Sequence, residues 1–311
     1  MKTFKISAVI LLILVVLLEI FVFKTETVKQ IQKPIVSVSS FSLYDITKHI
    51  AGDSVSVVNI LPFGTDPHSF ELTPKIMADI ENSQLVLYSG AGLEPWVDKI
   101  TFKSKVIDMS QYVRLRKIGS HEFEHHEHHD KQCAHNEEDP HYWLDFSNME
   151  ILVNVITKEL SIIAPKNSGF YEENKIAYIK MLHKLDRNYK KYLSECKIDT
   201  VILNHNSLGY LAQKYGFHSE SLSGLSPETD PSPKDVKRIL EEIKKDGVTT
   251  IFYENFVNAK LMKAISKDSD VSADVIQPLG NITADEAEAN ATYEELMYKN
   301  LEKLSKAMLC H

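Results

Sequence analysis

Short runs of β-branched and aliphatic residues alternate with stretches of helical character along most of this chain, and this alternation limits its possible folds more than any other feature. In the first half, strands are expected at residues 35–38, 55–60, 85–88 and 106–107, with helices at 42–50 and 73–81. Strands and helices that alternate in this way form a parallel sheet wrapped by helices. The first half is therefore predicted to be an α/β lobe.

The same alternation resumes in the second half. Strands are expected at residues 200–204, 249–253 and 274–276, helices at 207–215, 233–245, 259–266 and 285–308, and a loop at 221–233. The two halves thus predict two similar lobes, each with a mainly parallel sheet.

One long helix is expected between the halves. Apolar and aromatic residues return every three or four positions, as on one face of a helix, at Tyr178, Leu182, Leu185, Tyr189 and Tyr192. At ~1.5 Å per residue, a helix over residues 168–196 would extend roughly 40 Å, enough to run behind two lobes and join them. Before it, Ser147 and Glu150 form an S-x-x-E pattern, which predicts a capping box at the start of a helix that ends near residue 163.

The first 24 residues predict an export signal or a membrane anchor. Lys2 and Lys5 precede an apolar run that extends to Phe23 and is interrupted by Glu19. No small-x-small cleavage pattern follows the run, and no cysteine lies near it to carry a lipid. We therefore expect an uncleaved anchor, with the rest of the chain outside the cytoplasm.

These features divide the chain into five expected parts. They are the signal or anchor (1–24), a polar tether (25–33), an N-terminal metal-binding lobe (34–166) with a His-rich loop (119–139), a linking helix (167–196) and a C-terminal lobe (197–311). A length of 311 residues with 43% hydrophobic residues is sufficient for two lobes. The net charge of −8 argues against nucleic acid as a partner and favours a cationic ligand.

Three cysteines are too few for a disulfide framework. Cys196 and Cys310 could form one bridge outside the cell, but the sequence does not show whether they lie close together. Cys133 fits better with the histidines that surround it.

Histidines are concentrated in one tract. Seven of the thirteen lie between residues 121 and 141, and such a tract indicates metal binding because neutral imidazole is a common ligand. The members expected to gather metal at an accessory site are His121, His125, His126, His128, His129 and His135. Residues 121–125 also match the H-E-x-x-H pattern of zinc proteases, but Phe123 is the only large apolar residue that could anchor such a helix, which disfavours a protease.

Three other histidines occur in informative positions. The tripeptide Asp-Pro-His occurs twice, ending at His68 and at His141, and the proline restricts the backbone before each ring. His205 comes at the end of an expected strand, and ligands of α/β proteins gather beyond the carboxyl ends of strands. Together with the tract, these three residues predict a metal site.

Several motifs in the same order make the chain resemble the metal-binding proteins of ABC importers for zinc and manganese, most closely the zinc-specific, ZnuA-like members. The motifs include GTDPHSFE at 64–71, SGAGLEPW at 89–96, DPHYWLD at 139–145 and IFYE at 251–254. The resemblance covers nearly everything from residue 34 onward. It implies two α/β lobes joined by one long, rigid backbone helix, with the metal in the cleft between the lobes.

The resemblance also implies a function. The chain would bind Zn²⁺ with high affinity outside the cytoplasm, perform no catalysis, act as a monomer, and deliver the ion to a membrane permease driven by a cytoplasmic ATPase. Three alternatives remain open: a Mn²⁺ receptor of the same family, a membrane-tethered zinc metallohydrolase, and a metal-dependent adhesin.

The resemblance assigns His68 and His141 as ligands from the first lobe and His205 as the ligand from the second. Many relatives add a carboxylate from a Leu-Asp-Pro-Leu motif, where this chain reads Ile-Gln-Pro-Leu, so a glutamine replaces the aspartate. A neutral amide is a poor zinc ligand, which leaves the fourth position to water or to another group. The candidates for a fourth ligand, or for a neighbour of the ligands, are Gln277, Glu254, Glu228 and Asp230.

Three imidazoles favour zinc over manganese, because manganese prefers oxygen ligands. Only the neutral ring binds a metal, and the ordinary histidine pKa is about 6.5. The sequence therefore predicts that metal affinity falls below roughly pH 6.

Overall fold

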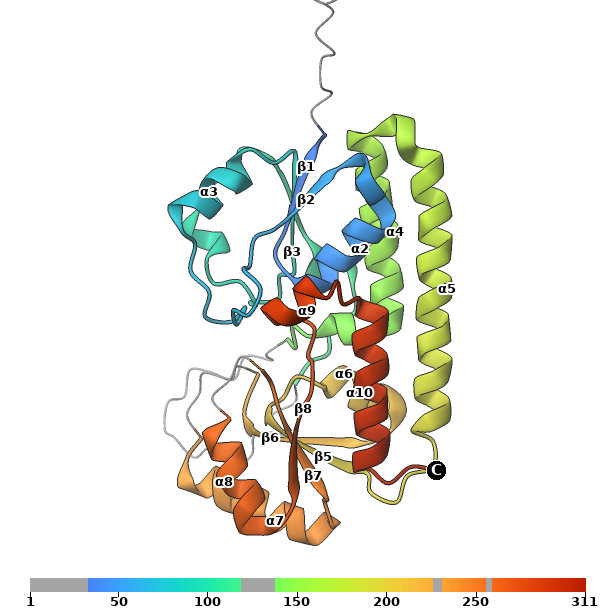
Figure 1. Ribbon diagram of the computed structural model, residues 1–311. Coiled ribbons are helices and arrows are strands. Elements are labelled where there is room, and N and C mark those ends of the chain that lie inside the picture. The colour runs from blue at the N-terminus through green and yellow to red at the C-terminus, as the bar shows by residue number, and fades with distance from the viewer. Residues whose placement is uncertain (1–32, 119–137, 226–230, 256–258) are drawn as a thin grey trace, which may run out of the picture. The chain divides into compact units, whose positions relative to one another are not determined.

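The computed structural model describes residues 33–118, 138–225, 231–255 and 259–311. Residues 34–311 form one compact unit with two parallel four-stranded sheets (Figure 1). Along the described ranges, no helix combines the length and the apolar character needed to cross a membrane. The expected anchor, the His-rich tract, Glu228 and Asp230 lie outside these ranges.

The first sheet contains strands β1 to β4 in the order β2-β1-β3-β4, all parallel. The strands are β1 (Ile35–Val38), β2 (Ser56–Asn59), β3 (Leu85–Tyr88) and β4 (Lys105–Asp108), and the helices beside them are α2 (Phe41–Ala51) and α3 (Pro74–Glu81). The strands and helices expected in the first half are thus confirmed. We call this sheet with its helices the first lobe.

The second sheet repeats this order, as β6-β5-β7-β8, and is also parallel. Its strands are β5 (Thr200–His205), β6 (His218–Ser223), β7 (Thr250–Tyr253) and β8 (Ser272–Val275), and its helices are α6 (Gly209–Tyr215), α7 (Pro233–Asp246) and α8 (Lys260–Ser269). We call this sheet with its helices the second lobe.

One strand of the second lobe was not predicted. Strand β6 reads HSESLS, and only its last two residues are buried. Because most of its residues are polar, the strand shows no hydrophobic pattern in the sequence. The expectation that a loop begins at residue 221 is wrong, since the strand extends to Ser223.

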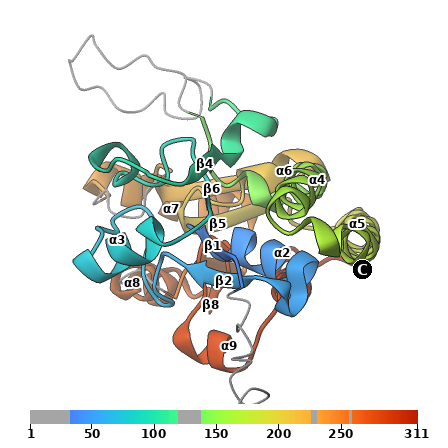
Figure 2. The ribbon, with the colours of Figure 1, turned by 90° about the horizontal axis from the view of Figure 1, so that it is seen from above.

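A pair of helices, α4 (Phe146–Ile163) and α5 (Ser168–Tyr192), lies beside the sheets. Helix α5 has 25 residues, packs against α2, α4 and α10, and runs past both lobes (Figure 1). Figure 2 shows α4 and α5 end-on, next to each other. It ends sooner than expected, and Tyr192 is 44% exposed rather than part of the buried face. Helix α4 begins one residue before Ser147, because the side chain of Asp145 caps it by accepting from Ser147 N, so the predicted capping box is wrong.

The closing helix is divided in two, α9 (Ala284–Glu288) and α10 (Tyr293–Ala307). Asn290 between them has a φ of 53°, a left-handed conformation that stops an α-helix. The side chain of Thr292 then opens α10 with a capping box. A single helix over residues 285–308 is therefore wrong.

Residues 277–283, which connect β8 to α9, lie against the first lobe. Gly280 O accepts from Phe41 N at 2.9 Å, and Ile282 O accepts from Gly64 N at 2.8 Å. The indole Nε1 of Trp143 donates to Pro278 O at 2.6 Å. We call residues 277–283 the crossover segment, since it ties the end of the second sheet to the first lobe.

A disulfide joins Cys196, just after α5, to Cys310, just after α10. The two residues also form an isolated antiparallel bridge. The pairing that the sequence left open is present in the structure.

Candidate metal centre

Three histidines from separate parts of the chain meet between the two sheets. His205 is the last residue of β5, His141 directly precedes the short helix η4 (Tyr142–Leu144), and His68 lies in the loop that follows β2. Their ring centroids are 5.5 Å (His68 to His141), 5.7 Å (His68 to His205) and 5.3 Å (His141 to His205) apart. One nitrogen from each ring lies within 4.8 Å of the other two.

The spacing of these nitrogens suits a tetrahedral ion. Nε2 of His205 lies 3.4 Å from Nε2 of His141. Two nitrogens at the usual Zn–N distance of 2.0–2.1 Å on a tetrahedral ion would be about 3.3 Å apart. The two rings are therefore already separated as zinc ligation requires.

Carboxylates fix the orientation of two of the rings. Asp139 Oδ1 lies 2.9 Å from Nδ1 of His141, and Glu254 Oε1 lies 2.9 Å from Nδ1 of His205. Ser207 Oγ donates to the same Glu254 oxygen at 3.0 Å. A hydrogen on each Nδ1 leaves Nε2 with its lone pair facing the other rings, which is the arrangement that metal-binding histidines share.

Burial and charge give the metal-free rings different pKa values. Burial, together with the neighbouring His141 and His205, lowers the pKa of His68 to about 2. Burial also opposes protonation of His205, but the adjacent Glu254 carboxylate outweighs it and raises the pKa of that ring. His68 is thus neutral over the ordinary pH range, whereas His205 takes up a proton at a higher pH than an ordinary histidine does.

The loop that carries His68 is held by local and distant contacts. Asp66 Oδ1 accepts from His68 N at 2.9 Å. Asn281 of the crossover segment is 1% exposed, and its Nδ2 donates to Pro62 O at 2.8 Å and to Thr65 O at 2.7 Å. The crossover segment, more than 200 positions later in the sequence, therefore helps to place His68.

The candidates for a fourth ligand differ in their positions. Glu254 lines the pocket of the three histidines, where it contacts His205. Gln277 is not among the pocket-lining residues; its Nε2 donates to Glu286 at 2.6 Å, and its Oε1 is buried without a hydrogen-bond partner in the described part of the chain. Among the described residues, three histidines make up the cluster.

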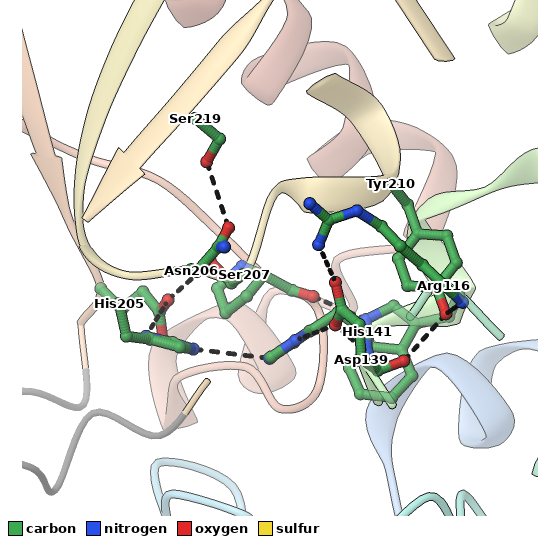
Figure 3. Close-up of polar contacts among 11 residues, drawn as sticks. Arg116, Asp139, His141, His205, Asn206, Ser207, Tyr210 and Ser219 are labelled. Carbon is green, nitrogen blue, oxygen red and sulfur yellow. Dashed lines mark hydrogen bonds and ion pairs between the residues drawn. The ribbon is translucent and has the colours of Figure 1, made fainter. Parts of the chain in front are cut away.

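Sequence reasoning did not assign roles to Asp139, Ser207 or Arg116. Arg116 pairs with Asp139, which in turn contacts His141 (Figure 3). The repeated Asp-Pro-His tripeptide could have indicated a role for Asp139, because an Asp side chain can accept a hydrogen bond from the backbone N of the residue two positions later. Here Asp139 Oδ1 accepts from His141 N. Arg116 and Ser207 carry no such local signal.

A protein family described as "Zinc-uptake complex component A periplasmic" (ZnuA) matches residues 36–307. The chain belongs to the ZnuA family. This agrees with the expectation that the chain is not an enzyme, since members of an uptake complex bind and transfer their cargo.

A curated relative agrees with this assignment. "Zinc-binding lipoprotein AdcA" from Streptococcus pneumoniae (strain ATCC BAA-255 / R6) is 32% identical over 301 residues, which cover 95% of this chain and 60% of AdcA. The chain thus spans less than two thirds of that relative's length.

Two solved structures share the fold. One is the Zn(II)-bound ZnuA-like domain of Streptococcus pneumoniae AdcA, with a TM-score of 0.72 at 30% identity; the match covers 89% of this chain and 99% of that domain. The other is the laminin-binding protein Lmb of Streptococcus agalactiae, described as a bifunctional protein with adhesin and metal transporting activity. Its TM-score is 0.78 at 30% identity, and the match covers 89% of this chain and 100% of Lmb. The predicted two-lobed α/β fold is confirmed.

Proposed function

We propose that this chain captures Zn²⁺ outside the cytoplasm with His68, His141 and His205 and delivers it to an ABC-type importer in the membrane. One observation carries the proposal: three imidazoles converge, and carboxylates hold two of them with Nε2 toward the others. The zinc-bound relative of the same fold supports the choice of ion.

Zinc fits this donor set better than manganese does. The three ligand candidates are all nitrogen donors, whereas Mn²⁺ prefers oxygen. Asp139 contacts Nδ1 of His141, and Glu254 contacts Nδ1 of His205. Their negative charges therefore favour a cation in the pocket, while the two imidazoles remain the groups that would contact the ion. Water would complete the coordination, as at other zinc sites with three protein ligands.

An extracytoplasmic location is part of this proposal. The Cys196–Cys310 disulfide supports it, because disulfides persist in oxidising compartments. The N-terminal segment would act as the tether, and the His-rich tract would gather zinc as an accessory. The partners would be a permease and its cytoplasmic ATPase, with the chain acting as a monomer.

Zinc titration of the full-length chain tests the proposal. Competition with a chromophoric chelator should show one tight site per chain, and the site should persist when residues 121–135 are deleted. An excess of Mn²⁺ should not displace the zinc. A tight site that disappears with the tract would overturn the assignment to the three histidines, and displacement by Mn²⁺ would reassign the cargo.

The pH dependence of zinc affinity follows from His205. Because Glu254 raises the pKa of this ring, a proton competes with zinc at a higher pH than it would at an ordinary histidine, and affinity falls as pH decreases. We expect a loss of about tenfold per pH unit, one proton being displaced, beginning above pH 6.5 rather than below it. His68 adds no competition in this range, since its pKa is about 2.

Glu254→Gln is the matching control for this pH profile. It keeps the size of the side chain but removes the charge that favours protonated His205. The onset of the affinity loss should move to lower pH. A profile that is flat from pH 8 to pH 6 in the unmodified chain would contradict the prediction.

Adhesion is a second candidate function, favoured by the likeness to Lmb. Binding of the chain to immobilised laminin, measured with and without zinc, tests it directly. Zinc capture and adhesion are separable, because changes at the three histidines would remove the first without altering the outer surface.

A further inference from the structure

The chain on either side of residues 119–137 closes into a short antiparallel stem. Lys117 and Glu138 form an isolated antiparallel bridge, and Asp139 N donates to Arg116 O at 2.9 Å. Two residues later the chain reaches His141. The stem therefore sets the position from which this ligand projects.

An ion pair that is shielded from solvent on the Asp139 side connects the stem to His141 (Figure 3). Nη1 of Arg116 lies 3.2 Å from Oδ2 of Asp139, and the side chains are 13% and 0% exposed. The other oxygen, Oδ1, accepts from His141 N at 3.0 Å and contacts His141 Nδ1 at 2.9 Å. Each carboxylate oxygen has its own partner, so the guanidinium fixes the rotation of the group that orients the ring.

Helix α6 of the second lobe covers this ion pair. The hydroxyl of Tyr210 accepts from Arg116 N at 2.8 Å and donates to Asp139 O at 2.8 Å. A Cβ atom at Gly209 would lie 2.8 Å from Arg116 Cζ and 2.9 Å from Asp139 Oδ2. Only glycine lets the helix backbone approach the pair this closely.

We propose that Arg116 is a positioning residue for zinc binding, acting through Asp139 on the ring of His141, with Gly209 and Tyr210 holding it from the second lobe. The inference rests on the proposed function. Outer partners of metal ligands typically contribute 10- to 100-fold in metal affinity, which sets the expected size of the effect.

Four variants of the full-length chain test the assignment by zinc competition. Arg116→Met removes the charge and should weaken zinc binding by about 10- to 100-fold, whereas Arg116→Lys, which keeps a cation beside Asp139, should restore most of the affinity. Arg114→Met is the control, since Arg114 is exposed and its backbone N, not its charge, contacts Asn148. Gly209→Ala should weaken binding although alanine is the better helix residue, because its Cβ displaces the guanidinium.

Two further readouts separate positioning from a general loss of structure. The visible absorption of bound Co²⁺, which reports ligand geometry, should change in Arg116→Met and recover in Arg116→Lys. In a His141→Ala background, Arg116→Met should cause no further loss, because the ring through which it acts is absent.

The outcomes are distinct. Zinc affinity unchanged in both Arg116→Met and Gly209→Ala overturns the inference, as does an equal loss with and without His141. If Arg116→Met does not fold, Gly209→Ala decides alone. An unmodified chain without a tight zinc site overturns the proposed function, and the inference with it.

Discussion

Replacing His68, His141 and His205 together by alanine is expected to abolish tight zinc binding. Structural zinc sites contribute about 10–16 kcal/mol in small peptides, or roughly 3 kcal/mol for each of four ligands. That corresponds to about a hundredfold in affinity per imidazole, so the triple change should weaken binding by about a millionfold. Competition with a chelator of known affinity measures the loss.

A matched control uses three histidines outside the cluster. His183, His218 and His311 are exposed, and their joint replacement by alanine removes the same number of imidazoles from the chain. This control should bind zinc with unchanged affinity. If the cluster variant keeps the tight site, or if the control variant loses it, zinc is bound elsewhere.

Replacing Trp143 by alanine is expected to destabilise the fold by about 3–5 kcal/mol, the usual cost of removing a large buried aromatic side chain. Trp143 is 1% exposed and its Nε1 donates to Pro278 O in the crossover segment. Its backbone carbonyl also accepts from the Tyr293 hydroxyl at 2.7 Å. Removing the side chain therefore leaves a cavity and takes away the indole donor to Pro278 O, at the place where the crossover segment meets the first lobe.

Urea unfolding measures this loss as a lower transition midpoint. Trp143→Phe should cost less, since a ring still fills most of the space. Ile176→Ala is the surface control, because Ile176 is 64% exposed and its truncation should change stability by no more than about 0.5 kcal/mol. A loss below about 1 kcal/mol for Trp143→Ala would show that the site repacks.

The parts of the fold that the sequence predicted are those with strong local patterns. Strands such as Val201 to Leu203 are apolar and buried on both faces, and the buried stripe of α5 repeats at helical spacing. Strand β6 was missed because five of its six residues are polar and only two are buried. The break between α9 and α10 at Asn290 was not predicted, because one residue in a left-handed conformation leaves the helical sequence pattern around it unchanged.

The candidate metal centre was predictable only in part. The three histidines stood out through the repeated Asp-Pro-His tripeptide and the strand end before His205, and the structure brings them together. The residues that orient them were harder to find, since Arg116 meets Tyr210 across 94 positions of the sequence. Contacts between such distant residues depend on how the lobes pack, which no local pattern reports.

The disulfide just after the C-terminal end of α5 affects what happens when a protease cuts the chain. Cys196 and Cys310 are separated by 114 positions, and the whole second sheet lies between them. The chain from Cys196 to Cys310, which includes the second lobe, is thus a closed covalent ring. A single proteolytic cut between the two cysteines opens the ring but releases no fragment, so the nicked protein remains one molecule until the disulfide is reduced.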